Sequence, residues 1–159
     1  AERVRMFGIA REIIGRQGLG WERRVMLLAP IVQAGQADAG AQAMASRYGC
    51  VEASAERASG EVVRIVSFLA RELRAQLARG SRYFVGDALS AADLYWAAFS
   101  LMLQPLPDSE CPMPEYMRHA YSATNPEIAA ALRPELLAHR DFVFRGHIGL
   151  PVDFRATSD

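Results

Sequence analysis

Residues 84–103 read FVGDALSAADLYWAAFSLML and carry the sharpest local signal in the chain. Ser90 and Asp93 have the S-x-x-D spacing of a capping box, in which two residues satisfy backbone N–H groups at the start of a helix. An acidic Asp stands where Glu or Gln is more usual, but its carboxylate can still accept from the Ser90 N–H. Leu89 and Leu94 occupy the two positions of a hydrophobic staple. The stretch therefore predicts a helix that begins at Ser90.

The residues that follow Asp93 are almost uniformly apolar as far as Leu103. A helix that is apolar all round is buried in a core, and this one is much shorter than a membrane span. No histidine is positioned by the sequence to complete a catalytic triad with Ser90 and Asp93. We therefore expect both residues to serve folding, and replacement of either by Ala to cost about 0.5–2 kcal/mol of stability.

The rest of the chain has helical periodicity and no alternating strand pattern, so we expect an all-α bundle in one domain over residues 1–159. Residues 34–60 are the least regular stretch, although AQAMASRY could hold a short helix. Pro30 should kink or end the second helix, and Pro134 should restart or kink the last one. Gly80 stands where a C-cap glycine belongs. The expected helices cover residues 2–15, a segment starting at Trp21, and residues 61–79, 114–122 and 126–147.

Composition excludes several classes of function. The 159 residues carry a formal net charge of +0, with 18 basic and 18 acidic residues, which gives no support for nucleic acid or an anionic membrane as a partner. Every basic residue is arginine. This could reflect recognition of phosphates or carboxylates, but the arginines are scattered, so we favour codon bias in a GC-rich genome.

The cysteines and histidines indicate neither a metal site nor a disulfide scaffold. Cys50 and Cys111 are far apart and form no CxxC pattern, which favours a reducing, cytoplasmic compartment. The first residues lack the apolar core of a signal peptide. His139, Arg140 and Asp141 are consecutive, so on a helix they point apart, and we interpret them as surface polarity or local ion pairing.

The segment GDALSAADLYW, residues 86–96, resembles the signature of the all-helical C-terminal domain of cytosolic glutathione transferases, with a bacterial-like character. That signature is a G-D-x-x-S-x-A-D run that opens a buried helix. The residues that match it are Gly86, Asp87, Leu89, Ser90, Ala92 and Asp93. The order of the expected helices agrees with the family over essentially the whole chain.

The resemblance implies a function and exposes a departure from the family pattern. Glutathione transferases hold glutathione, their co-substrate, mainly on an N-terminal thioredoxin-like domain, which this chain lacks. The resemblance thus implies the helical half of a transferase, which would bind a hydrophobic electrophile and form a homodimer. We expect no conjugation of glutathione, no cofactor and no catalytic residue in this chain alone. It is then either a fragment of a longer protein or a natural stand-alone domain.

The first expected helix has two apolar stripes. Met6, Ile9, Ala10 and Ile13 make one, and Val4, Phe7 and Ile14, with Arg11 among them, make the other. One stripe suits the core and the second suits a partner domain, a second subunit or a ligand. By the family resemblance, the candidate ligand contacts are Phe7, Arg11, Trp21 and Arg24. The alternative for Phe7 and Trp21 is ordinary packing, and for the two arginines solvation or ion pairing.

A second function remains open on the sequence. Similar helical domains act as non-catalytic assembly modules, in which helix faces mediate association with other proteins. A third hypothesis is that the chain is an unrelated helical bundle that has acquired the same capping box by convergence. A thioredoxin-like stretch encoded upstream of Ala1 would favour the enzyme, and an in-frame start there would favour the module.

Overall fold

The computed structural model describes residues 1–50 and 54–155. Within these ranges the chain forms α-helices, one short π-helix and no strand, which confirms the predicted all-α class. The elements are α1 (Glu2–Ile14), α2 (Leu19–Gln33), α3 (Ala39–Tyr48), α4 (Ser54–Leu77), α5 (Ala91–Ser100), α6 (Glu115–Ser122), α7 (Pro126–Ala131), α8 (Pro134–Val143) and the π-helix η1 (Phe144–Ile148).

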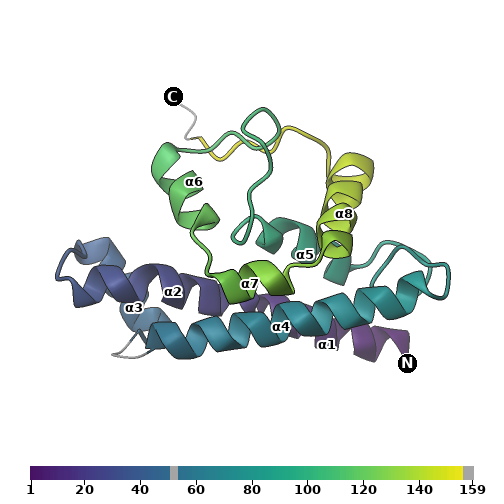
Figure 1. Cartoon of the computed structure of the whole chain (residues 1–159), viewed down its shortest axis with the longest axis horizontal. Helices are drawn as coiled ribbons and strands as arrows, with labels where there is room; N and C mark the ends of the chain where they lie inside the picture. Colours follow the sequence, from purple (N-terminus) through teal and green to yellow (C-terminus); the bar gives the residue numbers. More distant parts are fainter. Residues whose placement is uncertain (51–53, 156–159) are drawn as a thin grey trace.

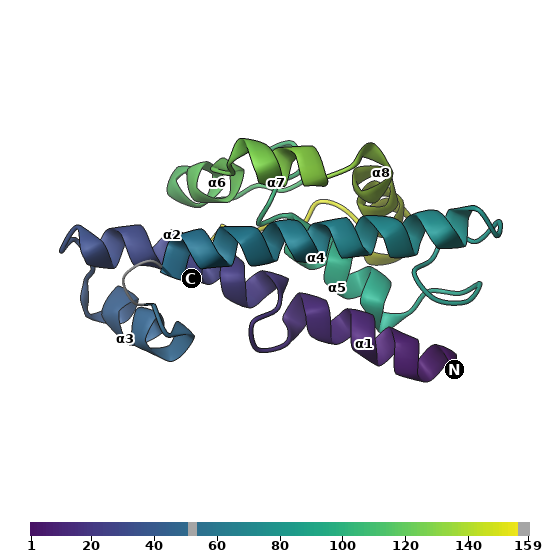
Figure 2. The ribbon, with the colours of Figure 1, turned by 60° about the horizontal axis from the view of Figure 1, so that its bottom comes forward.

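The long helix α4 has other helices on two of its sides. In Figure 1, α1 and α2 follow one another along α4 and run in the opposite direction to it. Figure 2 shows α6, α7 and α8 on the other side of α4, and α3 beside α2. The central helix α5 contacts α1 and α8, while α4 contacts α2, α7 and α8. A change in the position of α5 would therefore move both α1 and α8.

Two helix boundaries differ from the prediction, and a third agrees with it. The helix predicted from Glu61 begins at Ser54, because Ala58 is fully buried and its turn packs inside the bundle despite Gly60. Pro30 lies inside α2 and does not end it, since the last turn loses only one N–H there. The helix predicted over 126–147 restarts at Pro134, as predicted, because Arg133 has extended backbone angles, as a residue preceding proline prefers.

Most of the apolar residues that helical periodicity places on one face are buried in the core, with local exceptions. Trp96 on α5 is fully buried, and its indole N–H donates to the carbonyl of Leu136 on α8 at 3.0 Å. The prediction that α5 is buried all round is wrong at Leu94, which is 36% exposed, and at Ala98, which is also exposed. Likewise Leu77 is exposed at the end of α4. The main core comprises Ile9, Ile13, Leu19, Val62, Ile65, Val66, Leu69, Ala70, Leu73, Phe84, Val85, Ala92, Trp96, Leu103, Ile128, Leu132 and Leu136.

The segment that follows η1 packs back on the bundle. Leu150 and Val152 lie against a second cluster of buried residues that includes Leu106 and Cys111. The backbone N–H of Val152 donates to the carbonyl of Glu110 at 2.9 Å. Phe154 stays 39% exposed.

Gly20 provides a test of how closely α2 approaches α5. A Cβ at this position would overlap the ring of Phe99 on α5, whereas a Cβ at Gly60 on α4 would meet nothing within 4 Å. We therefore expect Gly20→Ala to destabilise the protein by about 1–3 kcal/mol through overpacking. The control Gly60→Ala should stabilise it by about 0.4–1 kcal/mol through the lower entropy of the unfolded chain.

Chemical denaturation of the two glycine variants measures both effects. Equal free energies of unfolding for Gly20→Ala and the unaltered protein would contradict the described packing of α2 on α5.

Candidate functional site

The carboxylate of Asp93 is fully buried and accepts four hydrogen bonds. Its Oδ1 accepts from the backbone N–H of Phe84 at 2.8 Å and from His139 Nε2 at 2.9 Å. Its Oδ2 accepts from the backbone N–H of Ser90 at 2.8 Å and from the Ser90 hydroxyl at 2.6 Å. Ser90 and Asp93 thus form a capping box at the start of α5, and two further segments converge on the same carboxylate.

The surroundings of Asp93 keep it ionised. Burial raises the pKa of Asp93, but the hydrogen bonds from His139, Ser90 and Phe84 together hold it below the ordinary value of an aspartate. An ionised carboxylate can only accept, so Nε2 of His139 carries the proton that points at it. The interpretation of His139 as surface polarity is wrong, because its side chain is 3% exposed and pairs with a carboxylate from α5. The alternative of local ion pairing is confirmed for Arg140 and Asp141, whose Nε and Oδ1 atoms are 2.8 Å apart.

The three polar groups are in the wrong order for nucleophilic catalysis. A triad needs the histidine between the serine and the acid, so that the imidazole can take the hydroxyl proton. Here the acid stands in the middle, with Ser90 on Oδ2 and His139 on Oδ1. His139 Nδ1 is buried with no hydrogen-bond partner in the described part of the chain. The cluster therefore connects segments of the fold and has no arrangement for acyl transfer.

The outer stripe of α1 is uncovered. Val4 is 76% exposed, Phe7 57% and Ile14 44%, and Arg11 on the same side is exposed as well. The opposite stripe, Ile9, Ala10 and Ile13, is buried in the core. Large apolar side chains gathered on one face of a helix are typical of an interaction site. We call this set, Val4, Phe7, Arg11 and Ile14, the outer face of α1.

Trp21 and Arg24 both contact Tyr48, a residue that the sequence did not indicate. The ring of Tyr48, at the end of α3, lies edge-on to Trp21 with 4.7 Å between centroids. The guanidinium of Arg24 lies 5.6 Å from the centroid of the same ring and 5.7 Å from that of Phe99. The structure therefore joins two of the four predicted contacts at the α2–α3 junction, while Phe7 and Arg11 lie on the outer face of α1.

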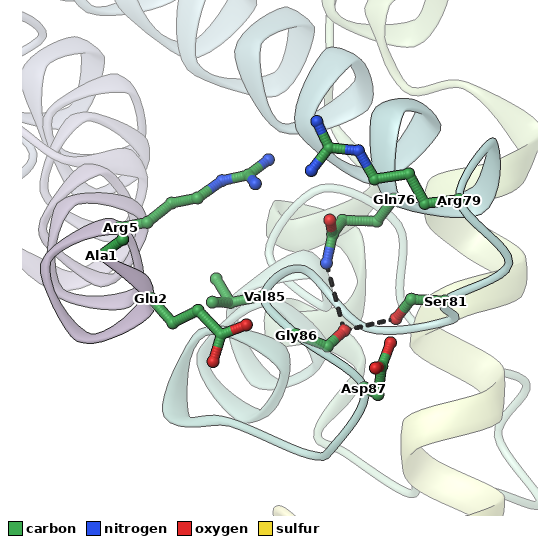
Figure 3. Close-up of a pocket in the computed structure, with 9 residues that line it drawn as sticks. All are labelled: Ala1, Glu2, Arg5, Gln76, Arg79, Ser81, Val85, Gly86 and Asp87. Carbon is green, nitrogen blue, oxygen red and sulfur yellow. Dashed lines mark hydrogen bonds between the residues drawn. The ribbon is translucent and has the colours of Figure 1, made fainter.

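Two hollows border these features. A cavity of about 280 Å³ lies between α2 and α3 and is lined by Arg24, Gly40, Ala43, Met44, Arg47 and Tyr48. A polar hollow of about 460 Å³ lies beside the start of α1, where Figure 3 shows Arg5 and Arg79 on one side of Gln76 and the Gly86 loop. Gln76 and Ser81 both donate to the Gly86 carbonyl in that view. Arg5 forms an ion pair with Glu72, with 2.7 Å between Nη2 and Oε2.

A buried arginine was also missed by the sequence reasoning. Arg23 is 1% exposed and donates to the carbonyls of Met102, Ala120 and Ala123, which ties α2 to the segment after α5 and to the end of α6. Burial lowers the pKa of Arg23 to about 10. Nothing in the run Trp-Glu-Arg-Arg distinguishes this arginine from its neighbour Arg24, because the difference arises only from helix phase and tertiary contacts.

Two further classes of site are absent from residues 1–50 and 54–155. These residues contain no group of three or more His, Cys, Asp or Glu placed to hold a metal ion. None of their helices combines the length and the apolar character that crossing a bilayer requires.

Comparison with known proteins identifies one family. The family described as "Glutathione S-transferase, C-terminal domain" matches residues 35–121, more than half of the chain. This range contains α3, α4, α5 and the capping box, and it confirms the resemblance noted for residues 86–96. The four candidate contacts on α1 and α2 lie before it. No curated protein and no solved structure matches the chain significantly.

The Asp93 cluster leads to a prediction about acid stability. Since its native pKa lies below the unfolded value, the stability that this carboxylate contributes is complete above roughly pH 4 and is lost as the pH falls through the native pKa. We expect Asp93→Asn to destabilise the protein by about 1–3 kcal/mol near neutral pH, because the buried donors on His139, Ser90 and Phe84 lose their charged acceptor. Ser90→Ala should lose about 1 kcal/mol.

Urea denaturation of the unaltered protein, Ser90→Ala and Asp93→Asn between roughly pH 5 and pH 2 measures this dependence. The unaltered protein and Ser90→Ala should lose more stability over this range than Asp93→Asn does. Parallel pH profiles for all three proteins would contradict the described role of the carboxylate.

Proposed function

Because the chain belongs to the family of glutathione S-transferase C-terminal domains, we propose that it forms the helical half of a protein that transfers glutathione to an apolar electrophile. The observation that carries the proposal is the outer face of α1, where Val4, Phe7 and Ile14 are exposed although the opposite stripe of the helix is buried. The family implies glutathione as the co-substrate.

The two halves divide the chemistry of the transfer. In the proposed reaction the glutathione thiol loses its proton on a thioredoxin-like domain, and the thiolate forms a carbon–sulfur bond as the leaving group departs. This chain holds the electrophile in place, which lowers the entropic part of the barrier. Phe7, Arg11, Trp21 and Arg24 are the proposed contacts, with Phe7 and Trp21 supplying apolar surface.

The same surface suits the expected partners. In a longer parent protein, a thioredoxin-like domain would precede Ala1 and lie beside α1, whose first residues line the polar hollow of Figure 3. We further propose a homodimer, the commonest oligomeric form of soluble proteins, in the reducing cytoplasm. Cys50 and Cys111 are both free thiols, which is consistent with that compartment.

We expect the isolated chain to bind an apolar ligand but not to catalyse its conjugation with glutathione. With glutathione and 1-chloro-2,4-dinitrobenzene, we expect conjugation at no more than the uncatalysed rate, because the thioredoxin-like domain is the half that is proposed to lower the pKa of the thiol. The neutral fluorophore N-phenyl-1-naphthylamine should bind with an increase in its emission. Phe7→Ser should weaken that binding about tenfold, which corresponds to ~1.4 kcal/mol.

The matched control for the binding experiment is Tyr116→Ser on α6, since Tyr116 is an aromatic residue that is 73% exposed and lies outside the proposed contacts. This variant should bind the fluorophore as the unaltered protein does. Absence of fluorophore binding, together with self-association that Phe7→Ser abolishes, would favour the non-catalytic assembly module instead. Conjugation by the chain alone would contradict the division of the reaction between two halves.

A further inference from the structure

The cavity between α2 and α3 is positively charged. Of its six lining residues, Arg24 comes from α2 and Arg47 from α3, and none is acidic. Of the acidic residues close to these in sequence, Asp38 stands beside Gly40 and accepts from the N–H of Ala41 at 2.8 Å, whereas Glu22 is fully buried in an ion pair with Arg57. Two cations that border one small cavity repel each other, and an anion bound between them removes that cost.

Arg24 is held in place before any ligand arrives. One of its terminal nitrogens donates to the carbonyl of Gly20 at 2.8 Å. The rings of Tyr48 and Phe99 lie 5.6 Å and 5.7 Å from the guanidinium carbon. A guanidinium has five N–H donors in a fixed plane, and the bond to Gly20 uses one terminal nitrogen. A cation oriented in advance loses little entropy when it binds a planar anion with two oxygens.

The remaining lining is apolar and partly exposed. Gly40, Ala43 and Met44 from α3 are exposed, and with the ring of Tyr48 they border an open volume of about 280 Å³. This lining favours a molecule with a compact hydrocarbon part over a bare inorganic anion, because burial of apolar surface adds to the charge interaction. The volume suits a single ring that carries one acidic group.

We propose that the cavity between α2 and α3 binds a small apolar carboxylate, with the carboxylate between Arg24 and Arg47 and the hydrocarbon part against Met44 and Tyr48. The inference rests on the proposed function in one respect: Arg24 belongs to the proposed electrophile contacts, so the preferred co-substrates would be acids. Trp21 reports on the cavity, because its ring packs on Tyr48, whereas Trp96 is fully buried elsewhere.

The test compares cyclohexanecarboxylate with its neutral isostere cyclohexanecarboxamide on the full chain. Calorimetry measures affinity, and Trp21 fluorescence reports the location. We expect the carboxylate to bind at least about tenfold more tightly than the amide, and inorganic phosphate not to displace it at equal concentration. Arg47→Gln and Arg24→Gln should each weaken carboxylate binding at least about fivefold and amide binding by a smaller factor.

The control variant is Arg71→Gln, because Arg71 is an exposed arginine on α4 that lies over the Phe68 ring and outside the cavity. This variant should bind the carboxylate normally. Arg47 is exposed, so Arg47→Gln keeps the test valid even where Arg24→Gln disturbs the fold. Circular dichroism of each variant verifies that it is folded.

Each contrary result has a separate meaning. Equal binding of carboxylate and amide, or equal losses in the Arg47 and Arg71 variants, would overturn the inference and leave the proposed function standing. Binding of the neutral fluorophore without binding of either cyclohexane ligand would do the same. If no ligand of any kind binds, the proposed function fails together with the inference.

Discussion

The carboxylate of Asp93 accepts hydrogen bonds from three segments: the loop at Phe84, the start of α5 at Ser90, and α8 at His139, which lies 46 positions away. A buried carboxylate without partners would be strongly unfavourable, so α5 is stable in this position only when all three segments are in place. Since α5 contacts both α1 and α8, the carboxylate also determines where the outer face of α1 lies. A polar cluster in the core thereby positions an apolar surface on the outside.

The outer face of α1 and the cavity between α2 and α3 differ in chemical character. The outer face of α1 is apolar and open, which suits a protein domain or a flat ligand, whereas the cavity is small and carries two arginines. Phe99 on α5 lies against both Gly20 and Arg24 on α2, and α5 also contacts α1. Packing at α5 therefore determines the orientation of the guanidinium that we propose as the carboxylate ligand.

Local signals were readable from the sequence, and long-range pairings were not. The capping box depends on two residues three positions apart, and the stripes of α1 depend on helical periodicity, so both could be inferred without a structure. His139 lies 46 positions from Asp93, and no local pattern indicates which histidine faces a buried carboxylate. Arg23 and Arg24 are neighbours, yet one is sealed in the core and the other borders a cavity. Tyr48 and Arg47 could not be identified as lining residues because their role depends on how α3 packs on α2.

Amide hydrogen exchange at Phe84 tests the central role of Asp93 most directly. This N–H lies in the loop between α4 and α5, outside any helical ladder, and its bonding partner is the Asp93 carboxylate. If the cluster ties the three segments together, the Phe84 amide exchanges only when the whole domain unfolds, with the same opening free energy as the core of α5. Exchange at the rate of an exposed loop, while α5 remains protected, would contradict the account.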